Sequence, residues 1–259
     1  MSKRKYDVNC NLPITVSQNF LTSRKIIERL IKRTSINEND HVVEIGAGKG
    51  HITRWLGEHC RCVSAVELDE KLYNRLVERY GECDGLIIHN CDFMEWQLPQ
   101  KGEYKVFANI PFHRTTDIIR KLTEHKNPPK EAWLVMEKGA AKRFMGMPKE
   151  SLRSLMLKPL FEMDISYYFK REDFHPMPRV DVVMLHIKKK VTQDVPTSKW
   201  HIYQRFTEVG FVNRKEGLLR LFTKKQLVKA YKEVGVNEIT AGEILYVQWL
   251  CLFRTYLRF

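Results

Sequence analysis

The tetrapeptide Asn109-Ile110-Pro111-Phe112 has the residue types needed to methylate an amino group on a flat base. The exocyclic amine of adenine is a weak nucleophile because its lone pair is delocalised into the ring. The side-chain oxygen of Asn109 and a main-chain carbonyl, that of Ile110, can accept its hydrogens and draw the nitrogen toward a tetrahedral geometry. Pro111 stiffens the turn, and Phe112 offers a face on which the base can stack. In isolation, a proline turn with a buried phenylalanine would be the better explanation.

A glycine-rich segment upstream predicts where a methyl donor would bind. Gly46-Ala47-Gly48-Lys49-Gly50 follows an apolar run, so the backbone can turn tightly there and approach a ligand closely. A phosphate-binding loop would need Ser or Thr after Lys49, and a dinucleotide fingerprint would need glycine at His51. The remaining pattern, Glu-x-Gly-x-Gly-x-Gly from Glu44, is typical of methyltransferases that use S-adenosylmethionine. A tight strand-to-helix turn without a ligand is the alternative.

Two acidic residues end the next two predicted strands. Glu67 lies about 20 residues after Gly46, the distance at which an acidic residue accepts hydrogen bonds from a ribose diol. Asp92 ends the following strand, where a carboxylate can accept from the adenine amino group of the cofactor. Taken singly, Glu67 could be a surface carboxylate beside Lys71, and Asp92 could be a helix cap. Together with Gly46 and Gly48, they predict a cofactor site across three strand ends.

Apolar runs that alternate with helical stretches would position these residues. The periodicity predicts a helix at residues 23–33, one after the glycine turn that ends at Leu56, and one at Asp69–Tyr80. The strands are expected at His41–Ile45, Val63–Glu67, Leu86–His89, Lys105–Ala108, Ala132–Glu137 and Val182–Ile187. This alternation predicts an α/β fold with a mostly parallel sheet, which is covered on both faces and binds ligands at the carboxyl ends of its strands.

The pattern changes after the lysine run Lys188-Lys189-Lys190. From about Trp200 onward the apolar spacing is helical and gives no strand signal. We therefore expect a Rossmann-like catalytic domain that binds S-adenosylmethionine at residues 1–190. A small all-α C-terminal domain that contacts RNA is expected at residues 191–259, with the boundary near 190–196.

The formal net charge of +13 over 259 residues favours a polyanionic partner, either nucleic acid or an anionic membrane surface. A merely basic soluble protein is the alternative. The sequence shows no apolar run of about 18 residues, no secretory signal and no Cys-x-x-Cys or His-Glu-x-x-His pattern. We expect a cytoplasmic monomer without a metal site. Four basic residues could contact RNA phosphates, although solvated helix surfaces explain them at least as well: Arg114, Lys138, Lys142 and Arg143.

Nearly from end to end, the chain resembles the erythromycin-resistance (Erm) rRNA adenine N6-methyltransferases, and more widely the rRNA adenine dimethylases. Ser17-Gln18-Asn19-Phe20-Leu21 matches the motif that closes over the methionine end of the cofactor in that family. The resemblance implies cofactor contacts for Gln18, Asn19 and Leu21. Phe174-His175-Pro176-Met177-Pro178 matches a later family motif, which implies that Phe174 is a second stacking face near the target base. Many relatives have Tyr at Phe112, so here stacking is kept but a hydroxyl hydrogen bond is lost.

The resemblance also implies a substrate, one adenine in the peptidyl-transferase region of 23S rRNA, offered as RNA rather than as the finished ribosome. Its methylation blocks macrolide, lincosamide and streptogramin B binding. The small-subunit rRNA adenine dimethylase is the second candidate, although Ser17-Gln18 and the terminus Leu252–Phe259 are more similar to Erm. A DNA adenine methyltransferase is the third, but such enzymes often carry Asp-Pro-Pro-Tyr. A non-catalytic RNA-binding ribosome-assembly factor is the alternative from another class.

Overall fold

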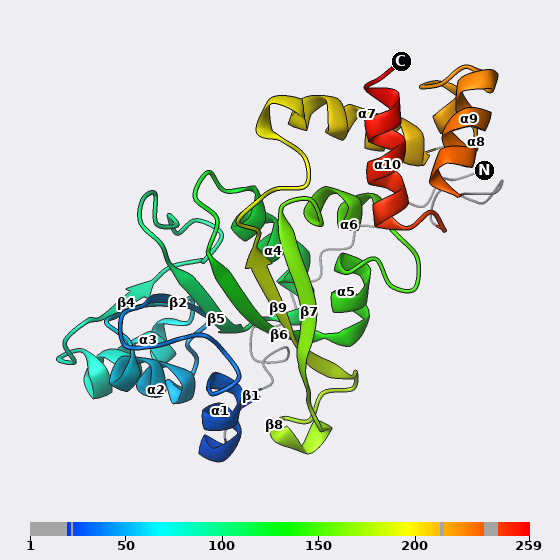
Figure 1. Ribbon diagram of the computed structural model, residues 1–259. Helices are drawn as coiled ribbons and strands as arrows, with labels where there is room; N and C mark the ends of the chain where they lie inside the picture. The colour runs from blue at the N-terminus through cyan, green and yellow to red at the C-terminus, as the bar shows by residue number, and fades with distance from the viewer. Residues whose placement is uncertain (1–19, 22, 213–214, 236–242) are drawn as a thin grey trace, which may run out of the picture.

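Seven strands form the main sheet in the described part of the chain (Figure 1). The computed structural model describes residues 20–21, 23–212, 215–235 and 243–259. The strand order in the sheet is β4-β3-β2-β5-β6-β9-β7. The bounds are β2 His41–Ile45, β3 Cys62–Glu67, β4 Leu86–Asn90, β5 Lys105–Asn109, β6 Glu131–Glu137, β7 Phe161–Tyr168 and β9 Val182–Lys189.

The sheet is mostly parallel, as the sequence predicts. β2 pairs in parallel with β3 and β5, β3 pairs with β4, and β5 pairs with β6. The chain builds outward from β2 to β4 and then resumes on the other side at β5. The strand order therefore reverses between β2 and β5, which is where open α/β sheets bind their ligands.

The two last strands of the sheet run antiparallel to their neighbours. The expected strand at Val182–Ile187 is β9, which pairs antiparallel with both β6 and β7. The apolar pattern of the sequence does not predict β7. Its apolar residues Phe161, Met163 and Ile165 alternate with exposed Glu162 and Asp164, the pattern of an edge strand that is buried on one side.

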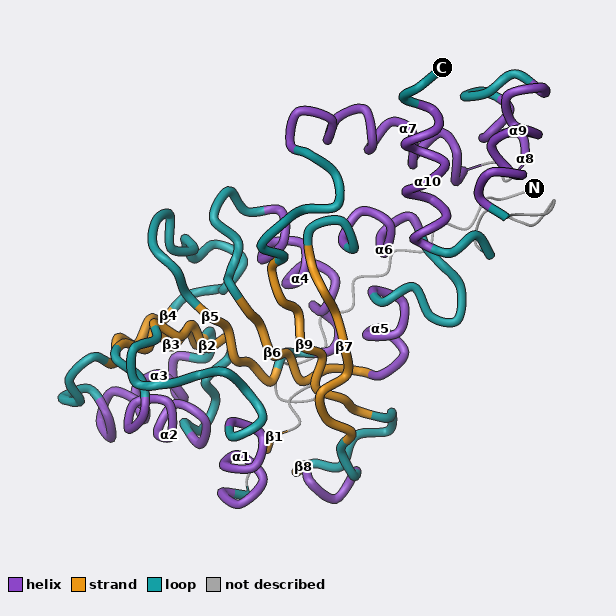
Figure 2. The backbone as a smooth tube through the Cα atoms, viewed as in Figure 1, coloured by secondary structure: helices purple, strands orange, loops and turns teal. Residues whose placement is uncertain are grey.

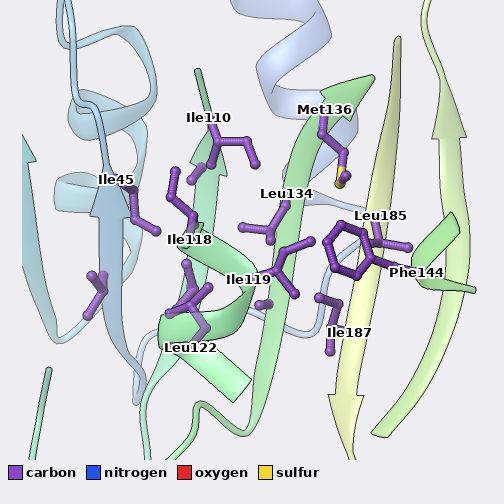
Figure 3. Close-up of a cluster of buried hydrophobic side chains, with 14 of the residues drawn as sticks. Ile45, Ile110, Ile118, Ile119, Leu122, Leu134, Met136, Phe144, Leu185 and Ile187 are labelled. Carbon is purple, nitrogen blue, oxygen red and sulfur yellow. The ribbon is translucent and has the colours of Figure 1, made fainter. Parts of the chain in front are cut away.

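Helices cover both faces of the sheet (Figure 2). The helices on one face are α1 Arg24–Ile31, α2 His51–His59 and α3 Glu70–Tyr80, and their apolar side chains share one core with the strands. α4 Thr115–Glu124 and α5 Lys138–Phe144 cover the other face. Figure 3 shows this second core, where Ile118, Ile119 and Leu122 of α4 pack against the strands. The apolar periodicity predicts the first group of helices, but it gives no bounds for α4 or α5.

The described residues after β9 form helices and no strand, which confirms the all-α expectation for this part of the chain. The helices are α7 Trp200–Val212, α8 Lys215–Leu219, α9 Lys224–Val234 and α10 Tyr246–Tyr256. Their core also contains Leu155 of α6 (Leu152–Leu157), whose carbonyl accepts a hydrogen bond from the Tyr203 hydroxyl at 2.8 Å. Because α6 precedes β7 in the chain, the helical core crosses the expected boundary. The division into residues 1–190 and 191–259 stays a prediction.

A second, two-stranded sheet joins segments that lie far apart in the chain. β1 (Phe20–Leu21) pairs antiparallel with β8 (Phe174–His175), and Leu21 lies opposite Phe174. The N-terminal motif and the later Phe-x-Pro motif are therefore neighbours in space. Within the part of the chain that the structure describes, no helix is long and apolar enough to cross a membrane.

Candidate active site

The glycine loop leaves the carboxyl end of β2, where Ile45 lies opposite Ala108 of β5. Gly46 and Gly48 have φ angles of 71° and 60°, which residues other than glycine rarely adopt. A Cβ atom on Gly48 would lie 3.0 Å from Cε1 of Phe20, whereas nothing lies within 4 Å of the same position on Gly46. The loop therefore packs against β1 at Gly48 and is open at Gly46.

Glu67, at the carboxyl end of β3, holds the glycine loop in place. Its Oε2 accepts a hydrogen bond from the N–H of Gly48 at 2.7 Å, and its Oε1 accepts one from the N–H of Asp69 at 2.9 Å. The side chain is buried, and this burial raises the pKa of Glu67. Each carboxylate oxygen has further acceptor capacity, so the same group can also accept from ribose hydroxyls. The ribose contact stays a prediction.

Asp92 follows β4 and is held from two sides. Its Oδ1 accepts from the N–H of Met94 at 2.8 Å, and its Oδ2 accepts from Nη2 of Arg114 at 2.7 Å. The sequence suggests either an RNA phosphate contact or a solvated helix surface for Arg114. The structure shows a third arrangement, an ion pair with the expected adenine contact. That Asp92 contacts the adenine of the cofactor stays a prediction.

Lys121 of α4 fixes the loop that carries Asp92. Its Nζ donates to the carbonyl oxygens of Phe93 at 2.5 Å, Met94 at 2.9 Å and Trp96 at 2.5 Å. Burial lowers the pKa of Lys121, because the charged ammonium is removed from water. This role of Lys121 could not be predicted from the sequence, since a single lysine on a helix does not indicate which loop it contacts.

The segment Asn109–Phe112 leaves the carboxyl end of β5 beside the glycine loop. Asn109 lies opposite Val135 of β6, and the N–H of Ile110 donates to the Val135 carbonyl at 3.2 Å. The Ile110 side chain is buried in the core (Figure 3), so it anchors the segment and leaves only its backbone to serve a ligand. Phe112 is half-buried and begins a short 3-10 turn, where its carbonyl accepts from the Thr115 hydroxyl at 2.9 Å.

Phe174 is not an open stacking face in this structure. Its side chain is only 4% exposed, and its ring centre lies 5.1 Å from that of Phe169. The ring belongs to the same core as Leu21, which is 3% exposed. Contact between this ring and the base would require β8 to move, so the role of Phe174 as a second stacking face stays a prediction. The cofactor contact of Leu21 likewise stays a prediction.

Gln18 and Asn19 lie outside the described residues, so their cofactor contacts stay predictions. Among the basic residues expected to face RNA, Lys138 lies 3.4 Å from Asp181, Lys142 is half-buried and Arg143 is exposed. Within the described residues, no group of three or more His, Cys, Asp or Glu side chains could hold a metal ion.

Buried polar atoms beside the glycine loop fit a cationic ligand such as S-adenosylmethionine. Glu44 of β2 is 1% exposed and has Thr53 of α2 beside its carboxyl, but its Oε2 has no hydrogen-bond partner of normal geometry within the described residues. Burial raises the pKa of Glu44 to about 8. Because a buried carboxylate oxygen without a donor is unfavourable, a bound ammonium group or its hydration water would supply the donor that Oε2 lacks. The signal in the sequence is a charged residue within the apolar run His41–Ile45.

Comparison with known proteins assigns the family. The sequence profile of the ribosomal RNA adenine dimethylase family matches residues 10–255. The chain belongs to this family. It is thus a methyltransferase with the Rossmann-like, S-adenosylmethionine-dependent fold that the sequence analysis expects.

Curated relatives and solved structures agree with this family. An rRNA adenine N-6-methyltransferase of Escherichia coli is 36% identical over 251 residues, which cover 96% of this chain and 98% of the relative. The Enterococcus faecalis protein of the same name is 35% identical over 251 residues, which cover 96% of this chain and 98% of that relative. The 23S rRNA methyltransferase ErmE has a TM-score of 0.83 at 25% identity and covers 92% of this chain and 99% of its own. A Plasmodium falciparum dimethyladenosine transferase, 20% identical with a TM-score of 0.73, shares the fold.

The buried carboxyl of Glu44 predicts a pH-dependent stability for the ligand-free methyltransferase. Burial raises the pKa of this carboxyl from 4.5 to about 8 in the folded protein. The unfolded chain therefore releases the proton at a lower pH than the folded protein does. As a result, the free energy of unfolding falls as the pH rises from about 4.5 to about 8. Glu44→Gln removes this loss. We expect the melting temperature of the variant, relative to wild type, to be about 5 °C higher at pH 8.5 than at pH 5. An offset between the two proteins that is the same at both pH values would contradict the raised pKa.

Proposed function

We propose that this methyltransferase transfers methyl groups from S-adenosylmethionine to N6 of one adenine in 23S rRNA, which confers resistance to macrolides, lincosamides and streptogramin B. The observation that carries the proposal is that Asn109–Phe112 and the Gly46–Gly50 loop leave adjacent strands at the same edge of the sheet. Adjacent strands lie about 5 Å apart, so a methyl donor at the loop and an amine at Asn109 would be neighbours. The names of the relatives support rRNA adenine as the acceptor.

The residues of the tetrapeptide position the amine rather than take part in bond chemistry. The side-chain oxygen of Asn109 and the carbonyl of Ile110 accept the two amine hydrogens, and Phe112 stacks on the base. This orients the N6 lone pair away from the ring and toward the donor. Bound S-adenosylmethionine supplies an electrophilic methyl group on its sulfonium sulfur. The new N–C bond forms as the C–S bond breaks, S-adenosylhomocysteine leaves, and the extra proton on N6 passes to water.

Glu67 and Asp92 bind the cofactor and hold its methyl group beside the segment Asn109–Phe112. We assign Glu67 to the ribose hydroxyls and Asp92 to the adenine amine, because the two carboxylates end β3 and follow β4 along the same edge of the sheet. Glu44 faces the cationic end of the donor across the glycine loop. No acidic general base is required, since a methylated N6 that carries positive charge releases its proton readily.

The target adenine must leave its base stack to reach Asn109. We therefore propose that the substrate is a loop or weakly paired region of free 23S rRNA rather than the finished ribosome, and that the enzyme acts as a cytoplasmic monomer. Lys and Arg side chains, which give the chain its net charge of +13, would contact the phosphates. Arg143 of α5 is exposed and is one candidate for such a contact.

This charge predicts that RNA binding weakens steeply with salt. Binding that neutralises several phosphates releases counterions, so we expect the affinity to fall by about 10- to 1000-fold between about 50 and 200 mM salt. Fluorescence anisotropy with a labelled RNA hairpin that contains the target adenine measures the effect. The affinity for S-adenosylmethionine, measured over the same salt range, serves as the control and should change little. An RNA affinity that is independent of salt would refute the electrostatic contribution.

Primer extension on both ribosomal RNAs tests the choice of target. After expression of the chain in a macrolide-sensitive bacterium, we expect a reverse-transcription stop in the peptidyl-transferase region of 23S rRNA and none that is new in the small-subunit RNA. A new stop only in the small subunit would instead assign the chain to small-subunit rRNA dimethylation. No new stop in either RNA would exclude dimethylation at both positions, because only an adenine with two methyl groups on N6 loses both pairing hydrogens and stops the transcriptase.

A further inference from the structure

Arg114 joins the catalytic segment to the expected adenine contact of the cofactor. It is the last residue of the 3-10 turn Phe112–Arg114, and its N–H donates to the Pro111 carbonyl at 2.9 Å. Its Nη2 lies 2.7 Å from Oδ2 of Asp92. A single side chain therefore connects the turn after β5 with the loop after β4, which lie on opposite sides of the glycine loop in the strand order.

The Asp92 carboxylate has a fixed orientation as a result. Its Oδ1 is bound by the N–H of Met94 and its Oδ2 by Arg114, so the plane of the group cannot rotate without breaking one of these bonds. The loop itself is held by the three carbonyls that bind Lys121. The lone pairs that remain free on the two oxygens therefore point in fixed directions.

The ion pair itself adds little to folding. The side chains of Arg114 and Asp92 are 39% and 29% exposed, and ion pairs that reach solvent contribute little to stability. A function in ligand positioning explains better why an arginine at the catalytic turn reaches this carboxylate. An amine of adenine that donates to Asp92 would meet an acceptor whose orientation is already fixed.

We propose that Arg114 is a positioning residue for the cofactor. By fixing Asp92, it selects ligands that carry the exocyclic amine of adenine, and it ties the occupied cofactor site to the segment Asn109–Phe112. This inference rests on the assignment of Asp92 to the adenine amine under the proposed function. It does not depend on which RNA is methylated.

The test measures the binding affinities of two ligands by calorimetry without RNA. One ligand is S-adenosylhomocysteine, and the other is the same molecule with hydrogen in place of the exocyclic amine of adenine. Wild type should prefer the amine-bearing ligand by about 10-fold or more, since hydrogen bonds to charged groups contribute about 1.5–3 kcal/mol. Arg114→Met should lower this preference by about 3- to 10-fold and leave the affinity for the analogue nearly unchanged. Arg114→Lys, which keeps a charged donor, should restore part of the preference.

Arg120→Met is the matched control, because Arg120 on α4 forms a 3.3 Å ion pair with Glu124 that is exposed on both sides. It should bind both ligands as wild type does. Equal weakening of both ligands by Arg114→Met would show a merely structural role and overturn the proposal. An unchanged preference in Arg114→Met would also overturn the proposal. Fluorescence anisotropy with the labelled RNA hairpin then shows whether Arg114 contacts phosphate instead, since the variant would bind RNA more weakly. A wild type without preference would overturn the premise about Asp92. None of these outcomes depends on the 23S rRNA target.

Discussion

Asn109→Ala is expected to abolish methyl transfer while S-adenosylmethionine still binds. The side-chain oxygen of Asn109 is the acceptor that orients the amine, and alanine cannot replace it. Loss of one preorganised polar group in an active site lowers kcat by about 100- to 1000-fold, so the turnover with 23S rRNA should fall to the background. The cofactor affinity, measured by calorimetry, should stay within about 10-fold of wild type.

Asn39→Ala is the matched control for this variant. Asn39 is exposed in the turn that precedes β2, at the amino edge of the sheet and so opposite the site. The same change there should leave both turnover and cofactor affinity as in wild type. If Asn109→Ala also keeps its turnover, the assigned role of Asn109 is wrong.

Glu67→Gln is expected to weaken S-adenosylmethionine binding by about 100-fold, because hydrogen bonds to charged groups contribute about 1.5–3 kcal/mol each. The carboxylate accepts from the N–H groups of Gly48 and Asp69 with separate oxygens. An amide has one acceptor oxygen, so one of these two N–H groups would face the NH₂ donors of glutamine. The loss should therefore affect both the glycine loop and the contact with the ribose. Calorimetry with S-adenosylmethionine measures it.

Glu58→Gln provides the comparison, since Glu58 is an exposed residue of α2 that pairs with Arg54. This variant should bind the cofactor normally. A Glu67→Gln protein with the affinity of wild type would show that the carboxylate neither holds the loop nor contacts the ribose. The melting temperature of the ligand-free variant separates two causes of weaker binding. A lowered value indicates that the glycine loop is destabilised, and an unchanged value indicates that only a ligand contact is lost.

Local patterns in the sequence were sufficient to predict the parallel half of the fold. Strands β2 to β6 are mostly apolar runs, and the glycine turn at Gly46 marks the end of the first of them. Because parallel strands end at one edge of the sheet, these runs also predict that Glu67, Asp92 and Asn109 lie along that edge. The direction of β9 could not be predicted, since an apolar run looks the same in either orientation.

Contacts between distant segments could not be predicted in the same way. The burial of Phe174 depends on its pairing with Leu21, and no pattern in either segment indicates that the two would pair. The ion pair of Arg114 with Asp92 likewise depends on how the turn after β5 faces the loop after β4. The strand β7 was missed for a different reason, because its apolar residues alternate with polar ones such as Glu162 and Asp164 and form no continuous apolar run.

Mass spectrometry of ribosomal RNA from cells that express the chain tests the central claim most directly. The account predicts one adenine in the peptidyl-transferase region of 23S rRNA that carries one or two methyl groups on N6, and no such adenine when Asn109→Ala is expressed to the same level. Unmodified 23S rRNA from cells that contain the folded wild-type protein would contradict it.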